Sequence, residues 1–208
     1  MYIKNPKEIE KKSMDIIEEV MDGLDYDERE KKIVKRMIHT TGDLEYRNIV
    51  EFRNGFVDAA IDLIKKESLI YSDTKMVNAG INKKIVYDMH CELVYFIDNQ
   101  DVLDMSIKNK TTRSSASIDK AATFGVDIYV IGNAPTAVFR MLELIEAGKI
   151  KPKLIIAVPV GFVGAAECKE ALRNLDTDIP MVTTVGNKGG SNVAASIVNA
   201  LLYMVSDR

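Results

Sequence analysis

The fold of this chain is decided by residues 126–136, which read Val-Asp-Ile-Tyr-Val-Ile-Gly-Asn-Ala-Pro-Thr. An almost continuously apolar run ends in a glycine-bearing loop, and a helical pattern then continues to Ala147 and stops at Gly148. A short apolar run bounded by glycine and proline is typical of a strand that is buried on both faces. The stretch therefore predicts one strand–loop–helix unit.

The same unit occurs twice more toward the C-terminus. Residues 154–158 form an apolar strand pattern before the glycine-bearing loop 161–164, and residues 181–185 form another before the loop 186–192. Three such units in series predict a mostly parallel sheet with helices on both faces. We expect a single Rossmann-like α/β domain over residues 1–208. Its glycine-bearing loops should lie at the carboxyl ends of the strands, where open α/β sheets bind ligands.

The N-terminal part of the chain is predicted to be mostly helical and to contribute to the site. Asn5 and Pro6 form a helix start, since asparagine caps well and proline suits the first helical position. A second helix begins at Asp25 or Asp27 and stops at Gly42, a typical terminating residue. Further patterns predict a helix at 56–66, a strand at 69–71, a short helix that ends at Gly80, a strand at 91–97 and a helix that follows residues 110–115 and runs to about Phe124.

Composition excludes several classes of protein and site. The net charge is −3, so there is no basic field and nucleic acid is not an expected partner. No apolar run approaches the ~18–20 residues that span a membrane. The N-terminal residues lack the apolar core of a signal peptide, so we expect a cytoplasmic protein. Cys91 and Cys168 form neither a disulfide framework nor a metal-ligand spacing, and no metal site is expected.

A candidate for acid–base chemistry lies at the end of the second predicted helix. The residues that form this helix's inward stripe are Ile33, Val34, Met37, Ile38 and Thr41. At helical spacing His39 points away from that stripe, and Arg36 shares its face one turn earlier. An imidazole beside a fixed positive charge suits proton transfer on an anionic ligand. The alternative is an ordinary solvated histidine at a helix end.

Two further positions carry polar side chains that fit a ligand. Ser13 lies within the apolar stripe of the first helix, and its hydroxyl either bonds back to a backbone carbonyl or faces a ligand. Arg113 follows Thr112 at a predicted helix N-terminus, where backbone N–H groups and a cation together suit an anion. The alternative there is plain capping by Thr112 or Ser114, with Arg113 in solvent.

The glycine-bearing loops lack the fingerprints of the common nucleotide and hydrolase sites. None reads G-x-G-x-x-G or G-x-x-x-x-G-K-[ST], and the chain has no G-x-S-x-G nucleophile elbow. A phosphate- or nucleotide-binding domain is therefore a weaker hypothesis, prompted by the glycines alone.

Four blocks of the sequence resemble the precorrin-8X methylmutase family, which includes the cobalt-precorrin-8 methylmutases. They are Arg-Met-Ile-His (36–39), Ile-Gly-Asn-Ala-Pro-Thr-Ala (131–137), Pro-Val-Gly-Phe-Val-Gly-Ala-Ala-Glu (159–167) and Gly-Gly-Ser (189–191). The resemblance implies an isomerase of cobalamin biosynthesis, which moves a methyl group between neighbouring ring-C carbons of a late tetrapyrrole and needs no cofactor. The alternative is a non-catalytic tetrapyrrole carrier on the same fold.

The resemblance also implies roles for individual residues. His39 takes the position of the family's catalytic histidine, which would hydrogen-bond or protonate a ring nitrogen. Ser13, Arg36 and Arg113 take substrate-contacting positions, and arginines suit the carboxylates of such a substrate. The family forms homodimers with the site near the subunit interface, so we expect an anionic tetrapyrrole and a second copy as partners. Asn187 departs from the family pattern, in which arginine is common.

Overall fold

A six-stranded sheet lies at the centre of the computed structural model, which describes residues 2–206. In chain order the strands are β1 (Val50–Arg53), β2 (Leu69–Ser72), β3 (Glu92–Val94), β4 (Ile128–Ile131), β5 (Leu154–Ala157) and β6 (Met181–Thr184). Their order in the sheet is β1-β6-β5-β4-β2-β3, and every neighbouring pair is parallel except β1–β6. Position 1 and positions 207–208 of the predicted domain lie outside the described residues.

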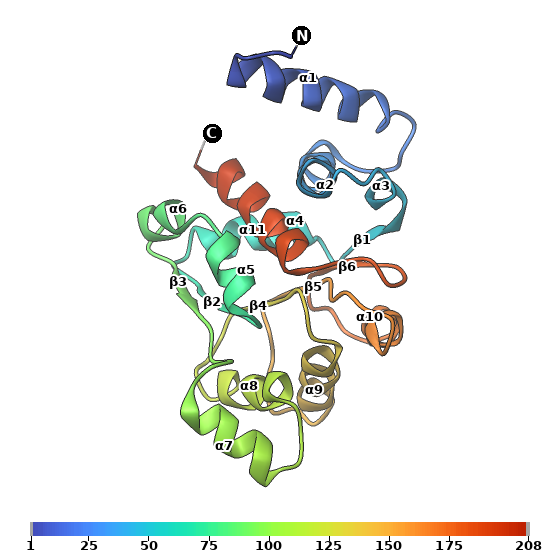
Figure 1. The fold of residues 1–208 in the computed structure, drawn as a ribbon. Coiled ribbons are helices and arrows are strands. Elements are labelled where there is room, and N and C mark those ends of the chain that lie inside the picture. Colours follow the sequence, from blue (N-terminus) through green and yellow to red (C-terminus); the bar gives the residue numbers. More distant parts are fainter. Residues whose placement is uncertain (1, 207–208) are drawn as a thin grey trace.

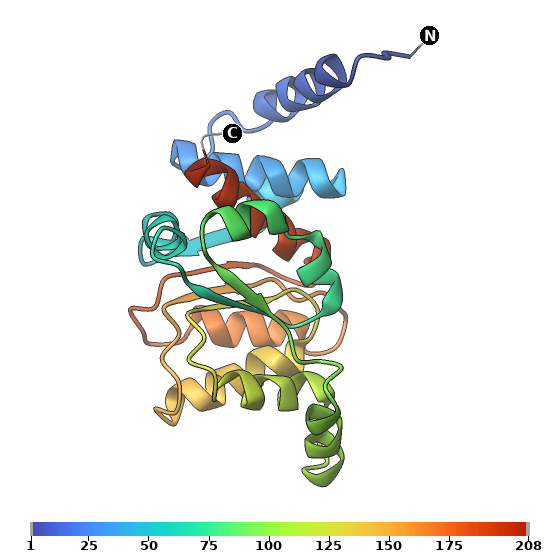
Figure 2. The same ribbon diagram turned by 90° about the vertical axis from the view of Figure 1, so that its left-hand side faces the viewer.

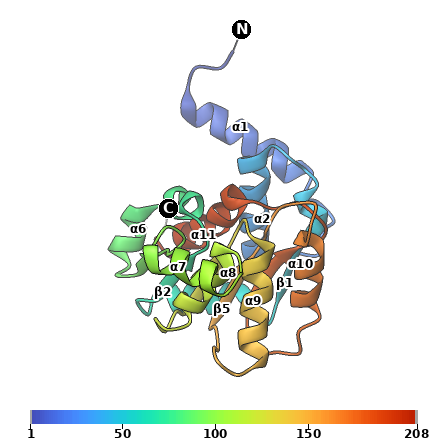
Figure 3. The same ribbon diagram turned by 60° about the horizontal axis from the view of Figure 1, so that its bottom comes forward.

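Helices cover both faces of this sheet, as predicted. They are α1 (Pro6–Glu19), α2 (Glu28–Thr41), α3 (Tyr46–Ile49), α4 (Phe56–Ile64), α5 (Lys75–Gly80), α6 (Lys83–Asp88), α7 (Gln100–Lys108), α8 (Arg113–Ala121), α9 (Pro135–Glu146), α10 (Ala165–Arg173) and α11 (Ser191–Val205). One layer contains α2, α4, α5 and α11, and the other contains α8, α9 and α10 (Figure 1). Figure 3 shows the second layer from its outer side, with α7 beside α8. Within residues 2–206, every helix falls short of the length and apolarity that crossing a bilayer requires.

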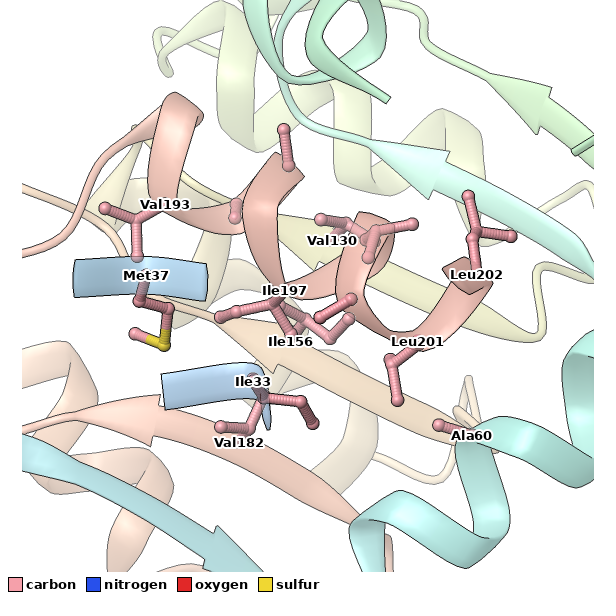
Figure 4. Packing of buried hydrophobic residues seen from close by; sticks show 14 of the residues in the cluster. Ile33, Met37, Ala60, Val130, Ile156, Val182, Val193, Ile197, Leu201 and Leu202 are labelled. Carbon is pink, nitrogen blue, oxygen red and sulfur yellow. The ribbon is translucent and has the colours of Figure 1, made fainter. Parts of the chain in front are cut away.

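The parallel strands are buried on both faces because alternate residues point into opposite layers. Ile128 and Val130 of β4 belong to the apolar cluster under α2, α4 and α11, whereas Tyr129 and Ile131 belong to the cluster under α8 and α9. Figure 4 shows the first cluster, in which apolar side chains of α2 and α11 pack together over Val130, Ile156 and Val182 of the strands. The near-continuous apolar runs in the sequence therefore reflect double-sided burial.

The helix ends follow the predicted caps. The Asn5 side chain accepts the Lys7 N–H at 3.0 Å, and Pro6 is the first residue of α1. Asp27 caps α2 in a reciprocal capping box with Glu30. That helix ends at Gly42, whose φ of 68° favours glycine.

Helix α1 differs from its prediction in how little of it is buried. Helical spacing puts Ile9, Ile16 and Ile17 on one apolar stripe of this helix. Ile9 and Ile16 are 45% and 52% exposed, and only Ile17 of the three is buried. The helix reaches out from the body of the molecule and crosses over α2 (Figures 1 and 2). Its apolar side therefore remains largely uncovered in a single chain.

Several elements were not predicted from the sequence. Helices α3, α6 and α7 are additional, and β3 is shorter than the predicted strand 91–97. Strand β1 extends the sheet through antiparallel pairing with β6, with Val50 opposite Thr184. A four-residue run is too short to show a strand period, so this strand is defined by its partner and not by its own pattern.

Candidate active site

The crevice where the strand order reverses is filled by the protein's own carboxylate. Strand β4 lies between the earlier β2 and the later β5, and such a switch point is where open α/β sheets commonly bind ligands. Here the buried Asp73 accepts hydrogen bonds from the three successive backbone N–H groups of residues 132–134, at 3.1, 2.9 and 3.1 Å. A phosphate would need these same donors. The occupied donors therefore argue against a nucleotide-binding site at this point of the sheet.

Two cavities flank the C-terminal end of α2. The first measures about 410 Å³ and is lined by Thr41, Asp43, Tyr46, Val160, Gly161, Phe162, Asn187, Lys188 and Gly189. The second measures about 230 Å³ and is lined by Ser13, Ile16, Ile17, Ile38, His39, Gly42 and Leu44. The glycine-bearing loops after β5 and β6 thus form a wall of the first cavity, as their place at the strand ends predicts.

His39 and Ser13 come from different helices and meet in the second cavity. The packing of Ile17 and Ile38 in the apolar core brings α1 across the last turns of α2. His39 is exposed, as its angular position on α2 predicts. The Ser13 hydroxyl makes no hydrogen bond within residues 2–206, so it does not bond back to a backbone carbonyl of its own helix. Ser13 instead lines the cavity.

Arg36 lies on a neighbouring flank of α2 and does not line this cavity. Its guanidinium stacks over the ring of Tyr203 on α11, 4.9 Å from the ring centroid. It lines two cavities, of about 240 and 230 Å³, neither of which contains His39. Helical spacing predicts that Arg36 and His39 face the same site, but they face different neighbours. They are about 60° apart around the helix axis, so Arg36 points toward α11 and His39 toward α1.

Arg113 is exposed at the start of α8, in the helix layer on the opposite face of the sheet from α2 (Figure 1). Thr112 caps this helix by accepting the Ser115 N–H at 3.1 Å, and its hydroxyl lies 2.8 Å from that of Thr136. Capping by Thr112 is thus confirmed. Within one chain, Arg113 lines none of the cavities that contain His39 or Arg36.

A lysine on the β6–α11 loop closes one side of the first cavity. The Lys188 ammonium pairs with Asp43 at 2.5 Å and with Glu45 at 2.6 Å. The pairing raises the pKa of Lys188 above its usual range, and the ammonium holds the pKa of the Asp43 carboxyl below its own. Gly189 is required next to it, because a Cβ atom there would overlap the carbonyl oxygen of Val158.

Lys169 supports the same loop from beneath. Its side chain is fully buried, and its Nζ donates to the Thr184 hydroxyl oxygen at 3.1 Å and the Lys188 carbonyl oxygen at 2.8 Å. Burial lowers the pKa of Lys169 to about 8. This residue was not predicted from the sequence, although a lysine at apolar-stripe spacing between Ala165 and Leu172 was a usable signal.

Comparison with known proteins identifies close relatives over nearly the whole length. Residues 8–204 match the family model described as precorrin-8X methylmutase. The chain is 39% identical to the cobalt-precorrin-8 methylmutase of Leptospira interrogans, over 97% of this chain and 95% of that protein. It is 41% identical to the enzyme of that name from Methanothermobacter thermautotrophicus, over 97% and 94% of the two chains. The crystal structure of precorrin-8X methylmutase from Thermus thermophilus superposes with a TM-score of 0.86, at 30% identity, over 96% and 98%.

The lowered pKa of Lys169 leads to a testable dependence of stability on pH. Between pH 8 and the ordinary lysine pKa of 10.5, the unfolded chain binds a proton that the folded chain has released. The free energy of unfolding should therefore rise with pH in this window, by about 2 kcal/mol up to pH 10, relative to a Lys169→Met variant. Urea unfolding of both proteins from pH 7.5 to 10 measures this difference. If the free energies of unfolding of the two proteins changed with pH in parallel, the lowered pKa of Lys169 would be contradicted.

Proposed function

The chain belongs to the precorrin-8X methylmutase family and is therefore an isomerase, and we propose that its natural substrate is cobalt-precorrin-8. The two relatives at 39% and 41% identity, which carry the name cobalt-precorrin-8 methylmutase, support the cobalt-containing form. The family match from residue 8 to residue 204 supports treating the whole chain as one methylmutase-type domain.

The chemistry that we propose is a methyl shift within one bound molecule. The methyl group leaves one ring-C carbon as it bonds to the neighbouring carbon, and the double bonds of the macrocycle rearrange without gain or loss of atoms. The His39 imidazole hydrogen-bonds to, or protonates, a ring nitrogen and draws electron density away from the migrating group. The observation that carries this proposal is the meeting of His39 and Ser13 in one cavity.

The remaining work of such a site is to bind and orient an anionic macrocycle. Arg36 lines two cavities beside α11, and Lys32 and Lys35 line one of them with it. These cations suit the carboxylate arms of the substrate in a protein whose net charge is −3. Lys35 is already paired with Glu18, so Arg36 is the stronger candidate for a substrate carboxylate.

We further propose that the site is completed by a second copy of the chain. A substituted tetrapyrrole is larger than the drug-sized ligands that fill pockets of ~300–1,000 Å³, and the cavity at His39 measures about 230 Å³. Exposed apolar side chains line both cavities at the end of α2: Ile16 in the His39 cavity is 52% exposed, and Phe162 in the neighbouring cavity is 93% exposed. An exposed apolar surface of this kind fits a protein partner. A partner subunit could also bring its own copy of Arg113 to the ligand.

Loss of His39 should remove most activity without unfolding the protein. We expect His39→Ala to lower kcat by about 10²–10⁴, because one positioned acid–base group contributes that much. Purified protein would be incubated with cobalt-precorrin-8 and with metal-free precorrin-8X, and the product followed by visible absorbance at constant mass. The wild type should convert the cobalt form faster, whereas a tetrapyrrole carrier would bind it without turnover.

The matched control is His90→Asn, at the only other histidine of the chain. His90 is exposed with φ at 54°, a conformation that asparagine tolerates. This variant should keep wild-type kcat. Equal activities of His39→Ala and the wild type would exclude His39 from catalysis.

Removal of Arg113 should weaken binding more than turnover. A charge-assisted hydrogen bond to a carboxylate contributes about 1.5–3 kcal/mol, so Arg113→Ala should raise Kd and KM about 10- to 100-fold. Titration of the variant with product, read by the tetrapyrrole absorbance, measures Kd directly. Unchanged Kd and KM would rule out a carboxylate contact at this residue.

The dimer proposal predicts that a charge on the open face of α1 impairs assembly. Ile9 is 45% exposed on this helix, and Ile9→Glu should increase the monomer fraction and lower kcat/KM together. Sedimentation equilibrium gives the mass of the assembly. The control is Ile107→Glu on α7, where the side chain is 68% exposed in the other layer. A wild type that sediments as a monomer while turning over substrate would refute the proposal.

A further inference from the structure

Lys169 is a buried charged residue that the methyl shift described above does not use. It lies on α10 with 0% of its surface exposed, and no carboxylate pairs with it within residues 2–206. Its hydrogen-bonding partners are the hydroxyl of Thr184 and the carbonyl oxygen of Lys188. Burial of an ammonium without a counter-charge is costly, so an apolar residue would stabilise this position better. The cost indicates a role beyond packing.

The contacts of Lys169 indicate this role, because they fix the position of Lys188 on the β6–α11 loop. The carbonyl oxygen of Lys188 accepts from the Lys169 ammonium at 2.8 Å and from the Thr184 hydroxyl at 2.8 Å. The ammonium at the far end of the Lys188 side chain reaches the α2–α3 turn, where Asp43 and Glu45 accept at 2.5 and 2.6 Å. Lys188 is thus fixed at its backbone from inside the protein and at its tip from the cavity rim.

The α2–α3 turn is in turn fastened to the helix that carries His39. The Asp43 N–H donates to the Thr41 hydroxyl at 3.2 Å, and that hydroxyl donates to the Met37 carbonyl oxygen at 2.9 Å. The Gly42 N–H donates to the Ile38 carbonyl oxygen at 2.8 Å. A continuous series of hydrogen bonds therefore runs from the buried ammonium to the last turn of α2.

We propose that Lys169 is a positioning residue for the methyl shift: its ammonium fixes the β6–α11 loop, and through Lys188 this loop fixes the turn of α2 that holds His39. The inference rests on the proposed role of His39. A reaction that depends on orientation is sensitive to such support, since a displacement of about 1 Å can cost about 10²-fold in rate. Lys169 acts through other residues, and it touches neither cavity that flanks the end of α2.

The test is a double-mutant cycle on kcat with Lys169→Met and Lys188→Met. Each variant should lower kcat about 10- to 100-fold with a smaller change in KM, measured where circular dichroism shows all variants folded. The double variant should be no slower than the worse single variant, because both changes interrupt one series of contacts. Lys153→Met, which breaks the 2.7 Å pair with Asp127 at the amino ends of the strands, should keep wild-type kcat.

A purely structural role would lower the melting temperature of Lys169→Met and leave the kcat of the folded enzyme unchanged, which would overturn the inference. The inference would also be overturned if the loss of kcat in the double variant equalled the product of the losses in the two single variants. If Lys169→Met does not fold, the test rests on Lys188→Met. The Lys188 side chain is 40% exposed, so its replacement should not prevent folding. An unchanged kcat of Lys188→Met then refutes the proposal.

A measurement without substrate separates this inference from the proposed function. The imidazole proton resonances of His39 should shift in both lysine variants, while those of His90 stay in place. An unchanged His39 resonance would overturn the inference whether or not the wild type turns over tetrapyrrole. A wild type inactive on both tetrapyrroles would instead overturn the proposed function.

Discussion

The position of His39 depends on how closely helix α11 packs against the sheet. A Cβ atom at Gly132 would lie 2.8 Å from the Ala194 Cβ and from the Ser191 Cα, and one at Gly80 would lie 2.8 Å from the Ala195 Cβ. Only glycine at these two places allows α11 to come so near the end of β4, at Gly132, and the end of helix α5, at Gly80. Helix α2 packs beside α11 in the same layer (Figure 4), so the position of α2 depends in part on where these glycines allow α11 to lie. The end of α2 then meets the loops after β5 and β6.

The same sheet architecture serves many functions, and here the local chemistry at the strand ends decides among them. Asp73 occupies the backbone donors that a nucleotide phosphate would need at the switch point. Two cavities lie instead beside the last turn of α2, and in one of them the segment after α2 meets the loops after β5 and β6. The N-terminal helices therefore carry the proposed reactive groups, and the loops after β5 and β6 form a wall of the neighbouring cavity.

Sequence patterns predicted the parts of the fold that are buried on both faces, because β4, β5 and β6 must be apolar throughout. They did not predict β1, whose four residues are strand only through pairing with β6. The angular position of His39 on α2 was predictable from a single helix. The separation of Arg36 from it was not, because that depends on which neighbour lies on each side of the helix. The meeting of Ser13 with His39 required either a structure or a family resemblance.

The site has one wall that is tightly bonded and one that is open. The end of α2 is fixed by its glycine cap, by the Lys188 ion pairs and by the loop beneath them. Helix α1, which brings Ser13, leaves Ile9 and Ile16 largely exposed. An intramolecular methyl shift offers the protein no leaving group to activate, so its rate depends on how precisely the macrocycle is held. If His39 acts as proposed, the fixed wall would supply that precision. The open wall would leave room for a ligand larger than the cavity of one chain, and in the proposed dimer a second subunit would cover the exposed side of α1.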